Sequence, residues 1–86
     1  MNIGERELEL IARLRQLQPL IDRGYAVERG ASGDVVIVRD GHVYGIWCVS
    51  DDAFAFVPGG YNEATKVART VEEVLTITQT HFERRA

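Results

Sequence analysis

The residues best suited to covalent chemistry are one cysteine, Cys48, and two histidines, His42 and His81. A thiolate beside an imidazole base is the pairing that cysteine nucleophiles use. Cys48, however, lies between Trp47 and Val49, where a free cysteine usually acts as a small hydrophobic residue with a raised pKa. His42 lies about 20 Å from Cys48 along the same extended segment, at about 3.3 Å per residue. The sequence therefore predicts no catalytic residue, and we expect the protein not to be an enzyme.

No metal or cofactor site is indicated by residue spacing. The histidines, the cysteine and the acids show no ligand spacing, such as two histidines one helical turn apart. The glycine pairs Gly30–Gly33 and Gly59–Gly60 invite comparison with phosphate-binding loops. Neither pair is followed by the Lys-Ser or Lys-Thr that such loops require. We therefore expect neither a metal nor a cofactor.

The size and composition of the chain indicate one small domain. Its 86 residues are 45% hydrophobic and 27% charged, with a net charge of −3, so we expect a single globular domain over 1–86. The start, Met1–Glu7, lacks the basic and apolar parts of a signal peptide. No apolar stretch approaches the roughly 20 residues that cross a bilayer. A lone cysteine also suits a reducing compartment, so we expect a cytoplasmic protein without membrane contact.

Two helical segments are predicted at the ends of the chain. In the first, apolar residues recur at helical spacing from Ile3 to Ile21, and Pro19 should end or kink the helix before a last turn. In the second, Thr70 and Glu73 form a capping box. The apolar stripe that follows consists of Val71, Val74, Leu75, Ile77, Thr78 and Phe82.

Between the helices, the sequence predicts an antiparallel meander of four strands near 25–29, 34–39, 42–49 and 53–57. Asp40-Gly41 is the strongest hairpin signal, because a type I′ turn needs positive φ at both central positions. We expect a second tight turn at Asp51-Asp52 and a looser one over 30–33. The predicted fold class is therefore α+β: a helix, a four-stranded antiparallel β-meander and a C-terminal helix, in two layers.

The hairpin turns fix a register and thereby assign the faces of the predicted sheet. Centring the first hairpin on Asp40-Gly41 pairs Val38 with Val43 and Val36 with Gly45. Alternation then places the bulkier set on the face that should receive the helices: Tyr25, Val27, Val36, Val38, Val43, Trp47, Val49, Phe54 and Phe56. The opposite face carries Ala26, Glu28, Val35, Ile37, Tyr44, Ile46, Cys48, Ala55 and Val57. A slip of one residue would exchange these faces.

The second face is the predicted interaction surface. Its large apolar side chains are Val35, Ile37, Tyr44, Ile46 and Val57. Leaving them in water would cost roughly 1.5 kcal/mol or more each. Either the first helix crosses this face to make a third layer, or a partner covers it. Two layers are the commoner solution for a short chain, so we expect a small interaction module that contacts a protein partner or forms a homodimer.

A small-ligand-binding domain is the alternative function. Such a site would use the aromatic residues Trp47 and Tyr61 together with the loop 58–69, the longest stretch without strong periodicity. Aromatic side chains commonly line ligand pockets.

A nucleic-acid-binding function ranks last. The order helix, meander, helix resembles that of double-stranded-RNA-binding domains, whose basic helix start docks on phosphates. Here the last helix begins with Glu72 and Glu73, which repel phosphate, and Lys66 and Arg69 alone make a thin basic patch. We therefore expect no nucleic-acid partner.

Overall fold

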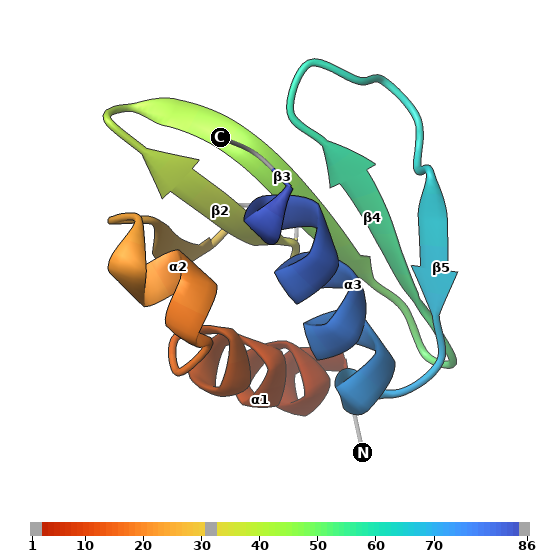
Figure 1. The fold of residues 1–86 in the computed structure, drawn as a ribbon. Coiled ribbons are helices and arrows are strands. Elements are labelled where there is room, and N and C mark those ends of the chain that lie inside the picture. Colours follow the sequence, from red (N-terminus) through yellow and green to blue (C-terminus); the bar gives the residue numbers. More distant parts are fainter. Residues whose placement is uncertain (1–2, 31–32, 85–86) are drawn as a thin grey trace.

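The computed structural model describes residues 3–30 and 33–84, whose arrangement is shown in Figure 1. The elements of this described part are, in chain order, α1 (Ile3–Leu14), α2 (Gln18–Asp22), β1 (Ala26–Arg29), β2 (Val35–Arg39), β3 (His42–Val49), β4 (Phe54–Pro58), β5 (Lys66–Ala68) and α3 (Val71–Glu83). The strands form one antiparallel sheet in the order β1-β2-β3-β4-β5. The helices lie on one side of it (Figure 1), which confirms the α+β class and the two-layer arrangement.

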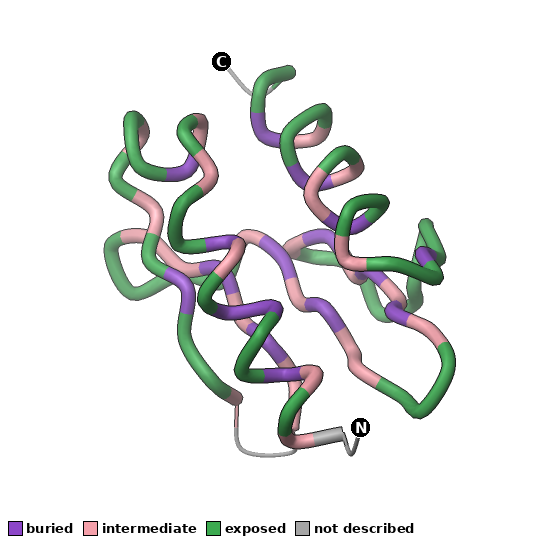
Figure 2. The backbone as a smooth tube through the Cα atoms, turned by 90° about the horizontal axis from the view of Figure 1, so that it is seen from below, coloured by how far each residue is buried: buried purple, intermediate pink, exposed green. Residues whose placement is uncertain are grey.

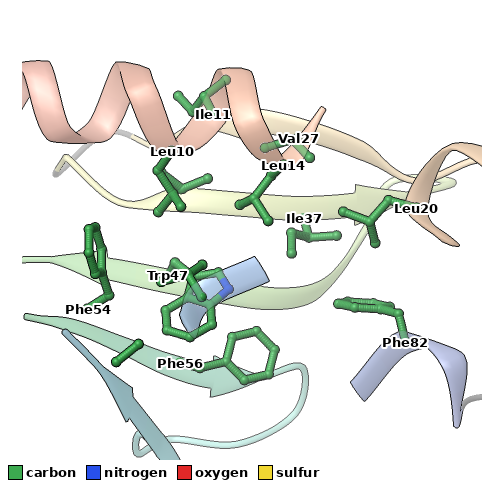
Figure 3. Packing of buried hydrophobic residues seen from close by; sticks show 13 residues of the cluster. Leu10, Ile11, Leu14, Leu20, Val27, Ile37, Trp47, Phe54, Phe56 and Phe82 are labelled. Carbon is green, nitrogen blue, oxygen red and sulfur yellow. The ribbon is translucent and has the colours of Figure 1, made fainter. Parts of the chain in front are cut away.

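The first helical segment breaks before Pro19, as predicted. Leu17 is extended, with φ of −76° and ψ of 117°, and separates α1 from the short helix α2. Pro19 lies in the first turn of α2, where its missing N–H leaves no helical hydrogen bond unmade. Gly24 follows with φ of 76° and turns the chain into β1. Leu10 and Leu14 are fully buried and point from α1 toward the sheet (Figure 3). Leu8, at the margin of the apolar stripe, is 57% exposed.

The predicted capping box begins α3. The Glu73 amide donates to the Thr70 hydroxyl oxygen at 3.1 Å, and the Arg69 amide donates to the Glu73 carboxylate at 3.2 Å. The buried stripe of the helix consists of Val74, Thr78 and Phe82. Within this stripe, the Thr78 hydroxyl accepts a hydrogen bond from Trp47 Nε1 at 2.9 Å, so the polar residue and the indole satisfy each other.

Both tight hairpin turns fall where the sequence predicts them. Asp40 and Gly41 have φ of 52° and 78°, which is the left-handed conformation that a type I′ turn requires. The first hairpin pairs Val38 with Val43, and the second turn brings Val49 opposite Phe54. The register next to each turn is therefore confirmed.

A β-bulge at Tyr44 shifts the register further along the first hairpin. Ile37, rather than Val36, faces Gly45, which leaves Tyr44 as an extra residue on β3. A Cβ atom on Gly45 would lie 2.7 Å from Cε1 of Phe56. Only glycine therefore lets β3 approach the Phe56 ring this closely. The predicted pairing of Val36 with Gly45 is wrong by one residue.

The bulge exchanges the faces of β2. Val35 and Ile37, predicted on the free face, are fully buried beneath the helices, and Val36 and Val38 take the opposite side. Of the residues predicted to face the helices on β3 and β4, Trp47, Phe54 and Phe56 are buried there (Figure 3). Val43 was predicted on the same face but pairs with Val38 on the opposite side, so that prediction is wrong. Figure 2 shows the resulting alternation of buried and partly buried residues along the strands.

A fifth strand lies within the stretch 58–69, for which the sequence predicts a loop. This strand, β5, pairs with β4 so that Val67 faces Ala55 and Ala68 faces Phe54. Three residues are too few to show a recognisable alternation of apolar and polar side chains. The meander predicted with four strands therefore carries one more at its edge in the described part of the chain.

Glu7 is a buried acid that the helical pattern did not identify. Its side chain is 1% exposed and accepts a hydrogen bond from Nε of Arg29, with which it also forms an ion pair. Burying a carboxylate is costly unless it is paired. The pair therefore ties α1 to the end of β1.

Candidate functional site: the open face of the sheet

Two of the predicted interface residues are lost to the core. Val35 and Ile37 are 0% exposed and pack in the cluster formed with the helices. No partner can reach them in the folded chain, so their assignment to an interface is wrong. The physical reason is the bulge, because one extra residue on β3 reverses which side of β2 faces the helices.

Tyr44 is tied to the helix side of the sheet. Its ring lies edge-on to Tyr25, with ring centroids 5.2 Å apart, and Tyr25 lies edge-on to Phe82 of α3 at 4.8 Å. The remaining predicted pair, Ile46 and Val57, face each other across β3 and β4. Both are partly exposed, so these two keep the predicted position away from the helices.

The face of the sheet away from the helices is apolar over several strands. We call it the open face, and define it by Val36, Val38, Val43, Ile46, Cys48, Ala55, Val57 and Val67. Val36, Ile46 and Val57 form one row across three neighbouring strands, and Cys48, Ala55 and Val67 form another. Val43 is 46% exposed and Val67 is 60% exposed. Contiguous exposed apolar residues of this kind mark interaction surfaces.

Sequence reasoning missed Val36, Val38 and Val43 as members of the open face. The available signal was Gly45, because an isolated glycine within a strand pattern suggests a bulge or a close backbone approach. Val67 gave no comparable signal, since β5 is so short.

Charge is confined to one end of the open face. Glu28 on β1 is exposed and faces Val36. Asp34 precedes β2 and interacts with Cys48. The rest of the face offers no charged group for an ionic ligand. The face is therefore suited to contact with another apolar surface, which would remove both surfaces from water.

Cys48 lies within the open face, in surroundings that disfavour its thiolate form. Burial raises the pKa of its thiol, and the charge and hydrogen bonding of Asp34 raise it further. The thiol therefore stays protonated at neutral pH, as the sequence predicts for a thiol within an apolar strand. His42 is exposed at the opposite end of β3.

The alternative ligand site does not form in the predicted way. Trp47 is 0% exposed, and its Nε1 is already bound to the Thr78 hydroxyl. Tyr61, in contrast, is 63% exposed beyond the end of β4. Because Trp47 cannot reach a surface ligand, that part of the alternative is wrong.

Neither a cluster of metal-ligating side chains nor a membrane-spanning helix occurs in the part of the chain that the structure describes. Over 3–30 and 33–84, no group of three or more His, Cys, Asp or Glu side chains is placed to hold a metal ion. None of the helices in these ranges is long and apolar enough to span a bilayer.

Comparison with known proteins does not assign the chain to a group. No protein-family model, no curated protein and no solved structure matches it.

Proposed function

We propose that the protein is a small cytoplasmic interaction module without catalytic activity, and that it self-associates through the open face. The observation that carries this proposal is the continuous apolar surface formed by β2, β3, β4 and β5 on the side away from the helices. Association would remove that surface from water, which is the dominant favourable term in most protein–protein contacts.

A second copy of the chain is the partner that fits this surface. The open face is shallow, because its side chains are mostly valine, and its charged neighbours, Glu28 and Asp34, are confined to one end. Two sheets of this kind can stack about 10 Å apart with their side chains interdigitated. A two-fold dimer needs one patch that matches itself, which an uncharged aliphatic surface does. Glu28 lies on the edge strand β1 and would stay hydrated at the rim.

The area of the face sets the expected strength of the dimer. The four strands that form the open face, β2 to β5, span about 14 Å at ~4.8 Å between strands. The eight residues of β3 extend over about 26 Å at ~3.3 Å each. Two such faces in contact would bury about 750 Å², which is below the ~1,200 Å² at which specific, stable interfaces begin. We therefore expect a weak dimer that depends on concentration.

Molar mass measured by light scattering, from low micromolar to near-millimolar protein, tests this proposal. The wild-type mass should rise from monomer toward dimer across that range. Ile46→Asp and Val57→Asp each place a charge within the interface and should keep the chain monomeric. Both side chains are partly exposed, so both variants should stay folded. Leu8→Asp is the matched control, because Leu8 is an exposed apolar residue on α1, and it should dimerise like the wild type.

A wild-type chain that stays monomeric over the whole range contradicts the proposal. An equal loss of dimer in Leu8→Asp also contradicts it, because the association would then not depend on the open face.

A further inference from the structure

A groove of about 400 Å³ lies between α3 and β5, on the helix side of the sheet. Its lining includes Phe56, Lys66, Thr76, Thr80, His81 and Arg84. This groove is separate from the open face, because Phe56 belongs to the buried cluster beneath the helices.

The helical wall of the groove has a regular spacing. Thr76, Thr80 and Arg84 follow one another at intervals of four residues and so lie along one side of α3. The His81 ring stands edge-on to the Phe56 ring, with centroids 5.1 Å apart. Because the capping box fixes where α3 begins, these side chains are held at defined heights along the groove.

The strand wall places a cation beside an apolar floor. Lys66 pairs with Phe56 across β5 and β4, so both side chains are on the same face of the sheet. The Thr65 amide donates to the Phe56 carbonyl at 2.8 Å, which holds the start of β5 against β4. Ile77 of α3, partly buried, adjoins the Phe56 ring and completes the apolar floor.

The described residues that line the groove include two fixed cations and no acid. Lys66 and Arg84 are both exposed. The ion pairs found within 3–30 and 33–84 involve other residues, so neither cation has an acidic partner there. On a chain with a net charge of −3, this is a local site that favours anions.

The C-terminal end of α3, which carries partial negative charge, is already compensated. The Arg23 guanidinium donates to the carbonyls of Phe82 and Glu83, the latter at 3.3 Å. The Glu83 carboxylate accepts a hydrogen bond from Gln79 at 2.7 Å. The helix end therefore opposes an anion in the groove less than a bare C-terminus would.

A second groove has a similar volume of about 400 Å³ but is lined by charges of both signs. It lies between α1 and the start of α3 and is lined by Arg6 and Arg69, but also by Glu9 and Asp51. Its charges cancel, and the Arg6 guanidinium already donates to the Asp51 carbonyl at 2.6 Å. That groove therefore has no preference for an anion.

We infer that the groove between α3 and β5 binds a small organic anion, a carboxylate attached to an aromatic or aliphatic group. The carboxylate lies between Lys66 and Arg84, beside the Thr80 hydroxyl as a further hydrogen-bonding group. The apolar part lies on the Phe56 ring. The volume is within the range of small-molecule sites. This site is independent of self-association, because it is on the opposite side of the sheet from the open face.

Phenylacetate is a suitable probe, followed through the amide signals of isotope-labelled protein. The amides of Lys66, Thr80 and His81 should shift in a saturable way, while that of Ile46 on the open face should not. Acetate lacks the apolar part, benzyl alcohol lacks the charge and benzylamine reverses it. Phenylacetate should bind about tenfold more tightly than any of these, which is the scale of one charge-assisted contact.

Variants separate a specific groove from general charge attraction. Lys66→Gln and Arg84→Gln should each weaken phenylacetate binding about tenfold. Arg69→Gln removes the same charge in the other groove and should leave the affinity unchanged. Thr80→Trp fills the groove without altering charge and should abolish binding. All four residues are exposed, so each variant should keep the wild-type fold, as its amide spectrum will report.

The absence of saturable shifts at the groove amides would overturn the inference. Equal affinity for phenylacetate and benzyl alcohol or benzylamine would do the same, since the cations would then have no role. An equal weakening by Arg69→Gln would assign the binding to net charge and so also overturn it.

Discussion

The two faces of the sheet are both apolar, yet only one is covered by the helices. The covered face carries the large aromatic residues Trp47, Phe54 and Phe56, which fill the space beneath α1 and α3. The open face is built mainly from valine and alanine and has no aromatic ring among its defining residues. Hydrophobicity therefore does not distinguish the faces. Side-chain volume does, because a helix packed on a sheet leaves a gap that only large side chains fill at protein density.

Two isoleucines on neighbouring strands, Ile37 on the covered face and Ile46 on the open face, allow the packing of the two faces to be compared. Ile37→Ala should lower the free energy of unfolding by about 3 kcal/mol, because the removed atoms are fully buried and leave a cavity. Ile46→Ala, on the open face, should cost about 1 kcal/mol or less. Urea unfolding of both variants at low protein concentration measures the difference. Equal losses would mean that the two faces are equally packed.

The close approach of Gly45 to the Phe56 ring, next to the bulge, can be tested by substitution. Gly45→Ala should lower the free energy of unfolding by about 2 kcal/mol, because the new methyl group would meet the Phe56 ring. Phe56→Leu, which shortens the opposing side chain, should make the combined loss smaller than the sum of the single losses. Chemical denaturation of the two single variants and the double variant measures this. Strict additivity would show that the ring does not constrain Gly45.

The polar contact beneath α3 should have a smaller effect. Thr78→Val should lower the free energy of unfolding by about 1–2 kcal/mol, because it leaves the buried Trp47 Nε1 without its acceptor. Thr80→Val changes an exposed threonine two residues further along α3 and should alter the free energy of unfolding little. Thermal unfolding followed by tryptophan fluorescence compares the two. A Thr78→Val variant as stable as Thr80→Val would contradict the role of the contact.

The smallest expected effect concerns the thiol of Cys48 on the open face. Because burial raises its pKa, alkylation by iodoacetamide should be slower than that of free glutathione at neutral pH and should rise at higher pH. Stability linked to this group is present below the pKa of an unfolded thiol and is lost as pH rises through the folded pKa. Cys48→Ser should remove that part of the pH dependence. Labelling as fast as glutathione would contradict the raised pKa.

Local signals in the sequence were reliable where neighbouring residues decide the structure. The Asp40-Gly41 turn, the break at Pro19 and the capping box of Thr70 and Glu73 all form as predicted. Each depends on backbone angles or hydrogen bonds within a few residues, so no distant contact is needed to specify it.

The candidate site was predicted less well, because the face on which a strand residue lies depends on pairing between strands and not on neighbouring residues alone. Of its five predicted residues, Ile46 and Val57 lie on the open face. Val35 and Ile37 lie in the core, and Tyr44 packs beside Tyr25 on the helix side, so these three predictions are wrong. The error follows from one extra residue at Tyr44 and not from any wrong judgement of hydrophobicity. Alternation propagates a single shift to every following position on a strand.

The sequence alone therefore determined that this chain is an α+β domain with a helix at each end and a meander between them. Tertiary structure decided the bulge, the burial of Glu7 and the strand β5. Gly45 contacts the Phe56 ring, Glu7 pairs with Arg29, and β5 pairs with β4. Each of these contacts joins residues at least ten positions apart, beyond the reach of a local sequence signal. Which apolar face remains open depends on such contacts, because residue types specify that a face is apolar while packing specifies which one is covered.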